Sequence, residues 1–232
     1  MEVSVINELR TNYMNDIKMI KSPEKPAFGY PPMKSNLTPP EPVKSNPSWS
    51  VPTAAECMQH WVDYEMFDNI KAHSTQVAKV AVSIALMAEK ANVPVDVKTI
   101  QASALLHDIA KSYCIKHSGN HSQLGSAWTM QLTGNPVIAM GVLHHVFWPF
   151  EPDAEKYFLP LLVSYADKRV MHDTMTSLEK RFSDLAVRYG KTEKIKQRIR
   201  QTFEQALILE QRLGNLIGVD LNACSFDSGR LV

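Results

Sequence analysis

The feature that most constrains this chain is the helical spacing of its apolar residues, which runs from Thr53 to about Leu213. Between His73 and Lys90, for example, the apolar side chains fall on one stripe of a helix, as an amphipathic segment requires. The alternating pattern typical of strands is nearly absent. Because 44% of the 232 residues are hydrophobic, the chain can bury a sizeable core. The sequence therefore predicts an all-α domain.

We expect helices at about 54–69, 73–90, 95–109, 122–132 and 136–145, and further helices that end near Met171, Tyr189 and Leu213. Asn135 followed by Pro136 predicts an N-cap with proline at the first helical position. Thr176 and Glu179 predict a capping box at the start of the helix that ends at Tyr189. The stretch 113–120 is expected to be a loop. The basic residues of the last helix are interpreted as a solvated face.

The first 52 residues differ in composition from the rest. The first twenty have the spacing of a short amphipathic helix, and nine of the 14 prolines lie between Pro23 and Pro52. Proline has no backbone N–H and restricts the residue before it, so regular structure is not expected there. The sequence predicts an extended, proline-rich N-terminal arm over 1–52 and one helical domain over 53–232.

Composition excludes several classes of partner. The formal net charge of +1 argues against non-specific binding to nucleic acid, which requires a strong basic excess. Cys57, Cys114 and Cys224 form no CxxC pair, and no apolar run approaches the length of a membrane span. With an acidic residue near its start, the chain lacks the pattern of a secretory signal. We therefore expect a cytoplasmic protein without a membrane partner; homo-oligomerisation stays open.

Histidine and aspartate side chains on separate predicted helices are the candidates for chemistry. Neutral imidazole and carboxylate groups together bind iron, manganese, cobalt, nickel or zinc, and magnesium is also compatible. Helical bundles build such sites from inward-facing side chains of neighbouring helices. The candidate positions are His73, His107, Asp108, His121, His144, His145 and Asp167. His60, His117 and His172 are interpreted as ordinary polar residues.

These residues occur in a recognisable order. The segment LLHDIAK at 105–111 resembles the motif of the HD superfamily of metal-dependent phosphohydrolases, in an HDIG-like form with alanine in place of glycine. AHSTQVAKVA, NHSQLGSAW, LHHV and YADKRV resemble the upstream histidine, the two additional histidine segments and the downstream aspartate of that family. The resemblance covers about 72–170. It implies a helical bundle with the metal site in its core.

The resemblance also implies residue roles. It assigns His73, His107, Asp108 and Asp167 to the core metal set, with Asp108 between two divalent cations. His121 and His144 would complete the ligand set of the second ion, and His145 is the alternative to His144. Asp108, Lys111 and Asp167 would act in catalysis, and the cations would lower the pKa of the attacking water. Substrate contacts are expected from Lys111, Lys168, Arg169 and Trp148, whose ring could stack on a nucleobase.

The implied activity is hydrolysis of a small phosphomonoester or phosphodiester, most plausibly nucleotide-like. FWPFEP follows LHHV and lacks the glutamate and GYP of the cyclic dinucleotide branch, which argues against that substrate. Two alternatives stay open. Some proteins of this scaffold are di-iron oxygenases with the same ligands, and the domain could instead be a non-catalytic module that binds metal or nucleotide.

Overall fold

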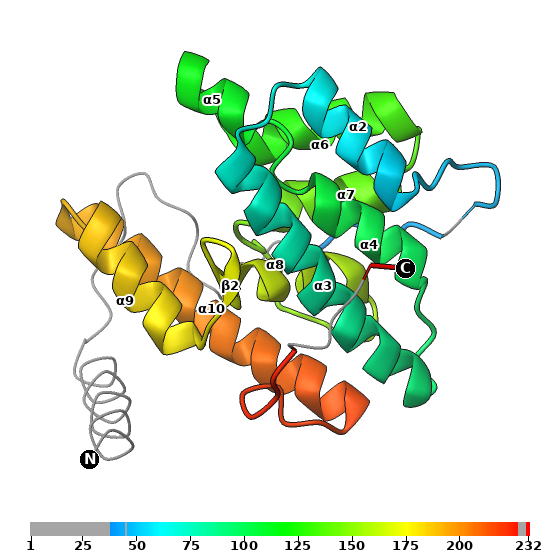
Figure 1. Ribbon diagram of the computed structural model, residues 1–232. Helices are drawn as coiled ribbons and strands as arrows, with labels where there is room; N and C mark the ends of the chain where they lie inside the picture. The colour runs from blue at the N-terminus through cyan, green and yellow to red at the C-terminus, as the bar shows by residue number, and fades with distance from the viewer. Residues whose placement is uncertain (1–37, 45, 227–230) are drawn as a thin grey trace. The chain divides into compact units, whose positions relative to one another are not determined.

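The computed structural model describes residues 38–44, 46–226 and 231–232. The predicted amphipathic helix in the first twenty residues lies outside this part of the chain. The described residues belong to one compact unit, 33–232, and are almost entirely helical (Figure 1), which confirms the all-α prediction. No helix in the described ranges is both long and apolar enough to cross a membrane.

The described elements are, in chain order, α2 (Ala54–Asp63), α3 (Asp68–Lys90), α4 (Val97–Leu106), α5 (Lys111–His117), α6 (His121–Thr133), α7 (Pro136–His144), α8 (Phe158–Lys168), β1 (Val170–Met171), β2 (Thr174–Met175), α9 (Leu178–Tyr189) and α10 (Glu193–Ile217). The two strands form one short antiparallel hairpin.

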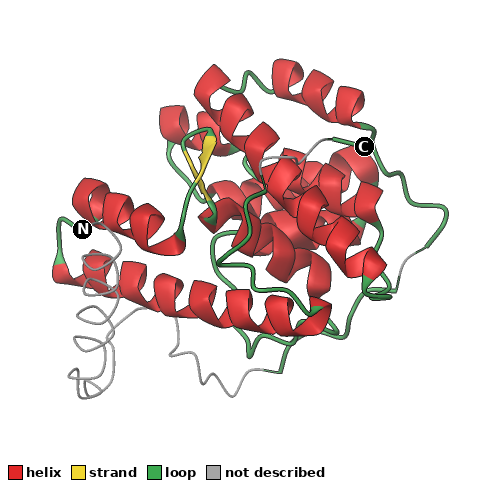
Figure 2. Ribbon diagram, turned by 60° about the horizontal axis from the view of Figure 1, so that its bottom comes forward, coloured by secondary structure: helices red, strands yellow, loops and turns green. Residues whose placement is uncertain are grey.

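Helices α3, α4, α7 and α8 form the centre of the bundle. α3 packs against α4 and α8, and α7 packs against α4, α6 and α8. α3 buries Ala78, Ala81, Ala85 and Ala88, and such small side chains let neighbouring helices approach closely. The long helix α10 runs past α8, with α9 folded back along it (Figure 2). The core therefore lies between the central helices and α10.

The first two predicted helices have different bounds in the structure. The helix expected over 54–69 ends at Asp63, because Glu65 adopts a positive φ of 50° that interrupts the helix. α3 then begins at Asp68 rather than at His73. His73 therefore lies in the second turn of α3, with helical residues before and after it.

Three further predictions need correction. The expected loop at 113–120 is largely the helix α5. The helix expected to end near Met171 ends at Lys168, and a β-hairpin that was not predicted follows it. α9 is capped by the Ser177 side chain and not by Thr176, whose backbone N–H donates to the carbonyl of Arg169 at 2.8 Å. The cap predicted at the start of α7 is confirmed, because Asn135 accepts from the backbone N–H groups of residues 137 and 138.

The described part of the proline-rich segment lies against the helices. The Tyr157 hydroxyl donates to the carbonyl of Pro40 at 2.7 Å, and the Asn135 amide donates to the carbonyl of Ser50 at 3.2 Å. The segment ends at Thr53, which forms a capping box with Glu56 at the start of α2. A domain boundary at 52/53 stays a prediction.

Candidate metal centre

Five elements of the bundle bring histidine and aspartate side chains to one place. His73 comes from α3, and His107 and Asp108 follow the last residue of α4. The first residue of α6 contributes His121 and the residue after α7 contributes His145, while Asp167 is the penultimate residue of α8. His107 and Asp108 have no exposed surface.

The ligand atoms form two groups that share Asp108. In the first group, His73 Nε2 lies 3.0 Å from Asp167 Oδ1, and His107 Nε2 lies 3.4 Å from Asp108 Oδ2. His107 Nε2 is also 3.8 Å from Asp167 Oδ1. In the second group, Asp108 Oδ1 lies 3.4 Å from Nε2 of both His121 and His145. The two oxygens of Asp108 thus face different groups.

Backbone carbonyls set the orientation of three of these imidazoles. Nδ1 of His73 lies 2.7 Å from the carbonyl of His172, and Nδ1 of His107 lies 2.7 Å from that of Ala104. Nδ1 of His145 lies 2.7 Å from the carbonyl of Val142. Because a carbonyl can only accept, each Nδ1 carries the proton and donates. Each Nε2 then keeps its lone pair and turns it toward the cluster, as a metal-ligating histidine requires.

Two buried atoms of the cluster have no hydrogen-bond partner among the described residues. They are Nε2 of His107 and Oδ1 of Asp108. A buried polar atom without a partner costs about 1–3 kcal/mol, and more when it is charged. In each group three ligand atoms lie within 4.8 Å of one another, which suits binding to a common cation. The donor set and the two unpaired atoms therefore fit divalent metal ions.

Two lysines lie next to the carboxylates. Lys111 Nζ lies 2.6 Å from Asp108 Oδ2, and Lys168 Nζ lies 3.1 Å from Asp167 Oδ2. Burial would raise the pKa of Asp108, but Lys111 and His107 hold it well below its usual range. Burial likewise opposes ionisation of Asp167, and Lys168 with His73 lowers its pKa well below the usual range. Both aspartates are therefore ionised at neutral pH.

The histidines of the second group are neutral at neutral pH. Burial lowers the pKa of His121 to about 4, against the opposing charge of Asp108. Burial also lowers the pKa of His145. For His107, burial acts in the same direction, but the two carboxylates outweigh it and raise the pKa. The two carboxylates thus favour positive charge at His107. The imidazoles of His121 and His145, which lie beside Asp108, are neutral.

The structure brings His145 into the cluster in place of His144, so the preference for His144 is wrong. Consecutive residues of a helix point about 100° apart, and at the end of α7 His145 is the residue that faces the centre. The His144 ring instead lies 4.9 Å from the Trp148 ring and 6.2 Å from that of Phe150, centre to centre.

Trp148 and Arg169 were also predicted to contact substrate, and both are buried in the protein instead. Trp148 is 1% exposed, and its backbone forms two hydrogen bonds with the Gln205 side chain. Arg169 is 2% exposed and donates to the carbonyls of Thr176 and Leu221. Neither side chain has a surface left for a ligand. The two predictions are therefore wrong, and both residues stabilise the fold.

Lys111 and Lys168 differ in their access to solvent. The Lys111 side chain is 36% exposed and lines a pocket that opens on the cluster. The Lys168 side chain is 8% exposed, and its ammonium group donates to the carbonyl of His145 and to Asp167. Lys111 can therefore reach a ligand, whereas Lys168 stabilises Asp167 from within the protein.

The pocket over the cluster has a volume of about 480 Å³. His73, Asp108 and Lys111 line its inner side. Its outer side is formed by α5, the hairpin turn and α9 through Ile115, His172, Asp173, Arg181, Leu185, Arg188 and Tyr189. The α9 residues were missed in the sequence, although their spacing of four, three and one places them on one helical face. His172, interpreted as an ordinary polar residue, lies at this pocket.

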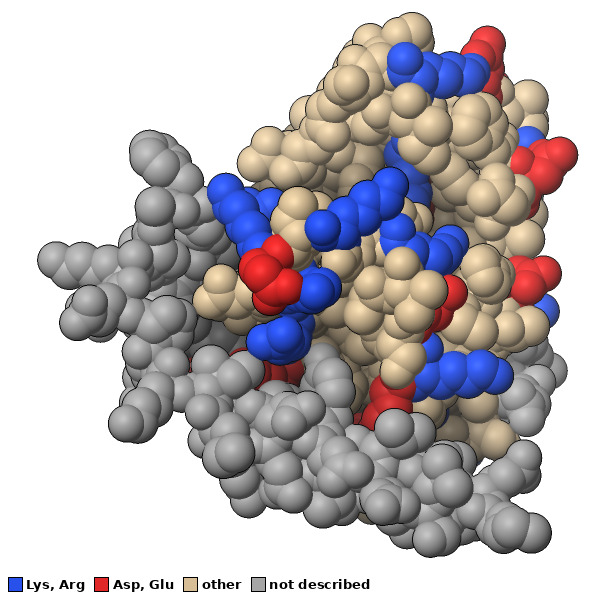
Figure 3. All heavy atoms as spheres, turned by 90° about the vertical axis from the view of Figure 1, so that its left-hand side faces the viewer, with Lys and Arg blue, Asp and Glu red and all other residues tan. Residues whose placement is uncertain are grey.

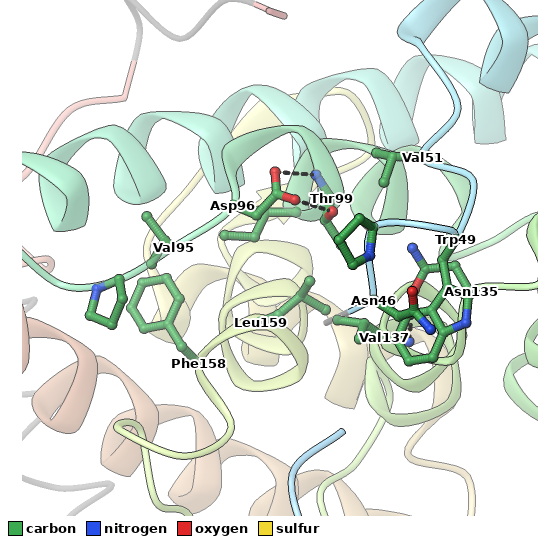
Figure 4. Close-up of a pocket in the computed structure, with 13 residues that line it drawn as sticks. Asn46, Trp49, Val51, Val95, Asp96, Thr99, Asn135, Val137, Phe158 and Leu159 are labelled. Atoms are coloured by element: carbon green, nitrogen blue, oxygen red, sulfur yellow. Dashed lines mark hydrogen bonds between the residues drawn. The ribbon is translucent and has the colours of Figure 1, made fainter. Parts of the chain in front are cut away.

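A second pocket, of about 360 Å³, lies between the proline-rich segment and the helices (Figure 4). Two of its polar residues, Asp96 and Asn135, cap helices. Asp96 accepts from the hydroxyl and backbone N–H of Thr99, and Asn135 caps α7. No histidine or cysteine lines it. The candidate metal ligands therefore lie at the first pocket.

Comparison with protein families matches residues 70–206, more than half of the chain, to the HD domain. The matched range contains all six residues that the structure gathers: His73, His107, Asp108, His121, His145 and Asp167. No match was found among curated proteins or among solved structures.

Proposed function

Because the chain belongs to the HD-domain family, we propose that it is a metal-dependent phosphohydrolase that cleaves a small phosphate ester. The observation that carries the proposal is the buried pair of ligand groups joined by Asp108, with unpaired atoms on His107 and Asp108. This cluster opens on a pocket that holds a lysine. Cation ligands beside a positively charged pocket suit a phosphoryl group.

The residues of the two groups would hold the cations. His73, His107, Asp108 and Asp167 would bind one ion, and Asp108, His121 and His145 the other. Bound divalent cations supply two effects, a lower pKa for a nearby water molecule and neutralisation of charge on phosphoryl oxygens.

The remaining steps fall to the side chains at the pocket. The Lys111 ammonium lies at the wall of the pocket and can donate to a non-bridging phosphoryl oxygen, which stabilises charge that develops during hydrolysis. Asp167 is 13% exposed, and its Oδ2 accepts from Lys168. That contact fixes the carboxylate, so that it can orient a water molecule.

The rim of the pocket suits the organic part of an ester. Ile115 and Tyr189 are 63% and 53% exposed, and both line the pocket together with Leu185. An exposed aromatic ring beside aliphatic side chains offers a surface for a nucleobase. Tyr189 thus takes the place that Trp148 cannot fill, and a nucleotide-like substrate remains the preferred class.

Metal content and hydrolysis measured on the same preparations test the proposal. Asp108→Asn keeps the side-chain volume but removes the shared charge, so we expect loss of bound metal and of phosphate release. His117→Ala is the control, because that histidine packs on Tyr113 and not on the cluster. Hydrolysis is measured anaerobically on a panel of nucleotides, cyclic nucleotides and generic phosphate esters.

The outcomes separate this proposal from the alternatives. An Asp108→Asn protein with full metal content and full turnover would contradict it. Iron-dependent oxygen consumption without phosphate release would identify the oxygenase chemistry of the same scaffold. A wild-type protein that binds metal and hydrolyses no ester in the panel would favour a binding module.

A further inference from the structure

Helix α9 forms the outer wall of the metal-site pocket and presents two arginines to it, Arg181 and Arg188. Leu178 and Phe182, at adjoining positions around the helix, are buried in the core, which fixes its orientation. Lys and Arg side chains gather on the side of the molecule where α9 and the start of α10 lie (Figure 3). The wall of the pocket formed by α9 is therefore basic.

The two arginines differ in their partners. Arg188 forms an ion pair with Asp184, one turn earlier on the same helix, at 2.8 Å. Arg181 forms no ion pair with another described residue, and its Nε is buried without a hydrogen-bond partner. Asp173 also lines the pocket but forms no ion pair with Arg181. Arg181 thus brings an unpaired positive charge to the pocket.

Arg181 lines the same pocket as Lys111. Lys111 pairs with the carboxylate of Asp108, whereas no carboxylate of the described residues pairs with Arg181. A charged guanidinium group whose buried donor lacks a hydrogen-bond partner is stabilised when an anion binds to it. Its fork of N–H donors matches the oxygens of phosphate.

We propose that Arg181 is a substrate-binding residue that holds a phosphate group in the pocket from the side opposite the metal cluster. The identification of that phosphate as part of the substrate rests on the proposed function. Anion binding by Arg181 does not, and it can be measured without turnover.

The probe is inorganic phosphate, titrated into the full-length protein by calorimetry, both with its metal and after treatment with a chelator. Arg181→Gln should weaken phosphate binding about tenfold or more in both states, because charge-assisted hydrogen bonds are lost. Arg181→Lys keeps the charge without the fork and should give an intermediate affinity. Arg188→Gln is the matched control, since Arg188 already has a carboxylate partner. It should change the affinity less than twofold.

Kinetics on the hydrolysed ester give the second measurement. Arg181→Gln should raise KM about tenfold with the metal content unchanged, and Arg188→Gln should leave both near the wild-type values. Circular dichroism checks folding. If Arg181→Gln does not fold, the lysine variant decides the question, because wild-type phosphate affinity and KM in that variant would overturn the proposal.

The remaining outcomes are distinct. Unchanged phosphate binding in Arg181→Gln overturns the inference even if the protein hydrolyses esters. Equal losses of phosphate affinity in Arg181→Gln and Arg188→Gln also overturn it, because they would indicate that binding depends on the overall positive charge of the pocket. Weaker phosphate binding in Arg181→Gln alone supports it, and does so even if no ester is hydrolysed, in which case the proposed function fails by itself.

Discussion

Alanine at position 145 should weaken one cation site, whereas alanine at position 144 should not. His145 Nε2 lies 3.4 Å from Asp108 Oδ1 and 3.1 Å from His121 Nε2, so its removal takes one of three ligands from the second group. Loss of a residue that only supports a ligand already costs about 10–100-fold in metal affinity. We expect His145→Ala to lose at least that much.

The loss of affinity converts into thermal stability by mass action. A weakening of 10–100-fold removes about 1.4–2.7 kcal/mol of metal-dependent stabilisation at saturating metal. For a domain of this size, that corresponds to about 3–10 °C in Tm. His144→Ala removes ring contacts with Trp148 and Phe150, which are worth about 0.5–1.5 kcal/mol each and do not depend on metal.

The assay is the difference in Tm with and without a chelator, together with metal content by elemental mass spectrometry. His145 is buried, so its alanine variant is also less stable without metal, and the difference removes that contribution. We expect the metal-dependent difference to shrink in His145→Ala and to match the wild type in His144→Ala. The reverse pattern, with the metal lost in His144→Ala alone, would refute the ligand assignment.

Two further predictions concern packing outside the metal centre. Gln205→Leu leaves the backbone N–H and carbonyl of Trp148 without their buried partner and should cost about 2–4 kcal/mol in urea unfolding; a wild-type midpoint would contradict this. Gly141→Ala places a methyl group against the Ser103 hydroxyl and 2.7 Å from Leu159 Cδ2, and should cost about 1–3 kcal/mol. Adding Ser103→Ala should recover part of that loss, and a double variant less stable than Gly141→Ala would contradict the steric explanation.

Local capping rules and periodicity predicted most of the helices but not α5. The cap at Asn135 and the helix after it follow from side-chain chemistry within four residues, so the sequence contains the whole explanation. α5 is different, because Tyr113 and Ile115 are 45% and 63% exposed and only Ser112 is buried. A helix that buries so little shows no apolar stripe, so periodicity could not detect it.

Packing between helices explains why the substrate contact predicted for Arg169 is wrong. Arg169 follows directly after the ligand-bearing helix α8, yet its guanidinium turns to the carbonyls of Thr176 and Leu221. Nothing in the sequence near Arg169 indicates that a segment more than fifty residues later supplies an acceptor. Arg181 was missed for the same reason, because only the packing of α9 places it opposite the cluster.

The positions of residues around helix α7 distinguish His145 from His144 as the ligand. Ile138 and Val142 are fully buried and lie four residues apart on α7, and the next position on that stripe is residue 145. Nδ1 of His145 indeed donates to the carbonyl of Val142 on the same stripe. The ligand therefore continues the apolar face of its helix into the cluster, and His144 lies on a different face. His73 follows the same rule, because it lies four residues before the fully buried Val77 on α3. In α7 and α3 the ligand cluster thus extends the core, so the burial phase of the helix identifies which histidine faces the cluster.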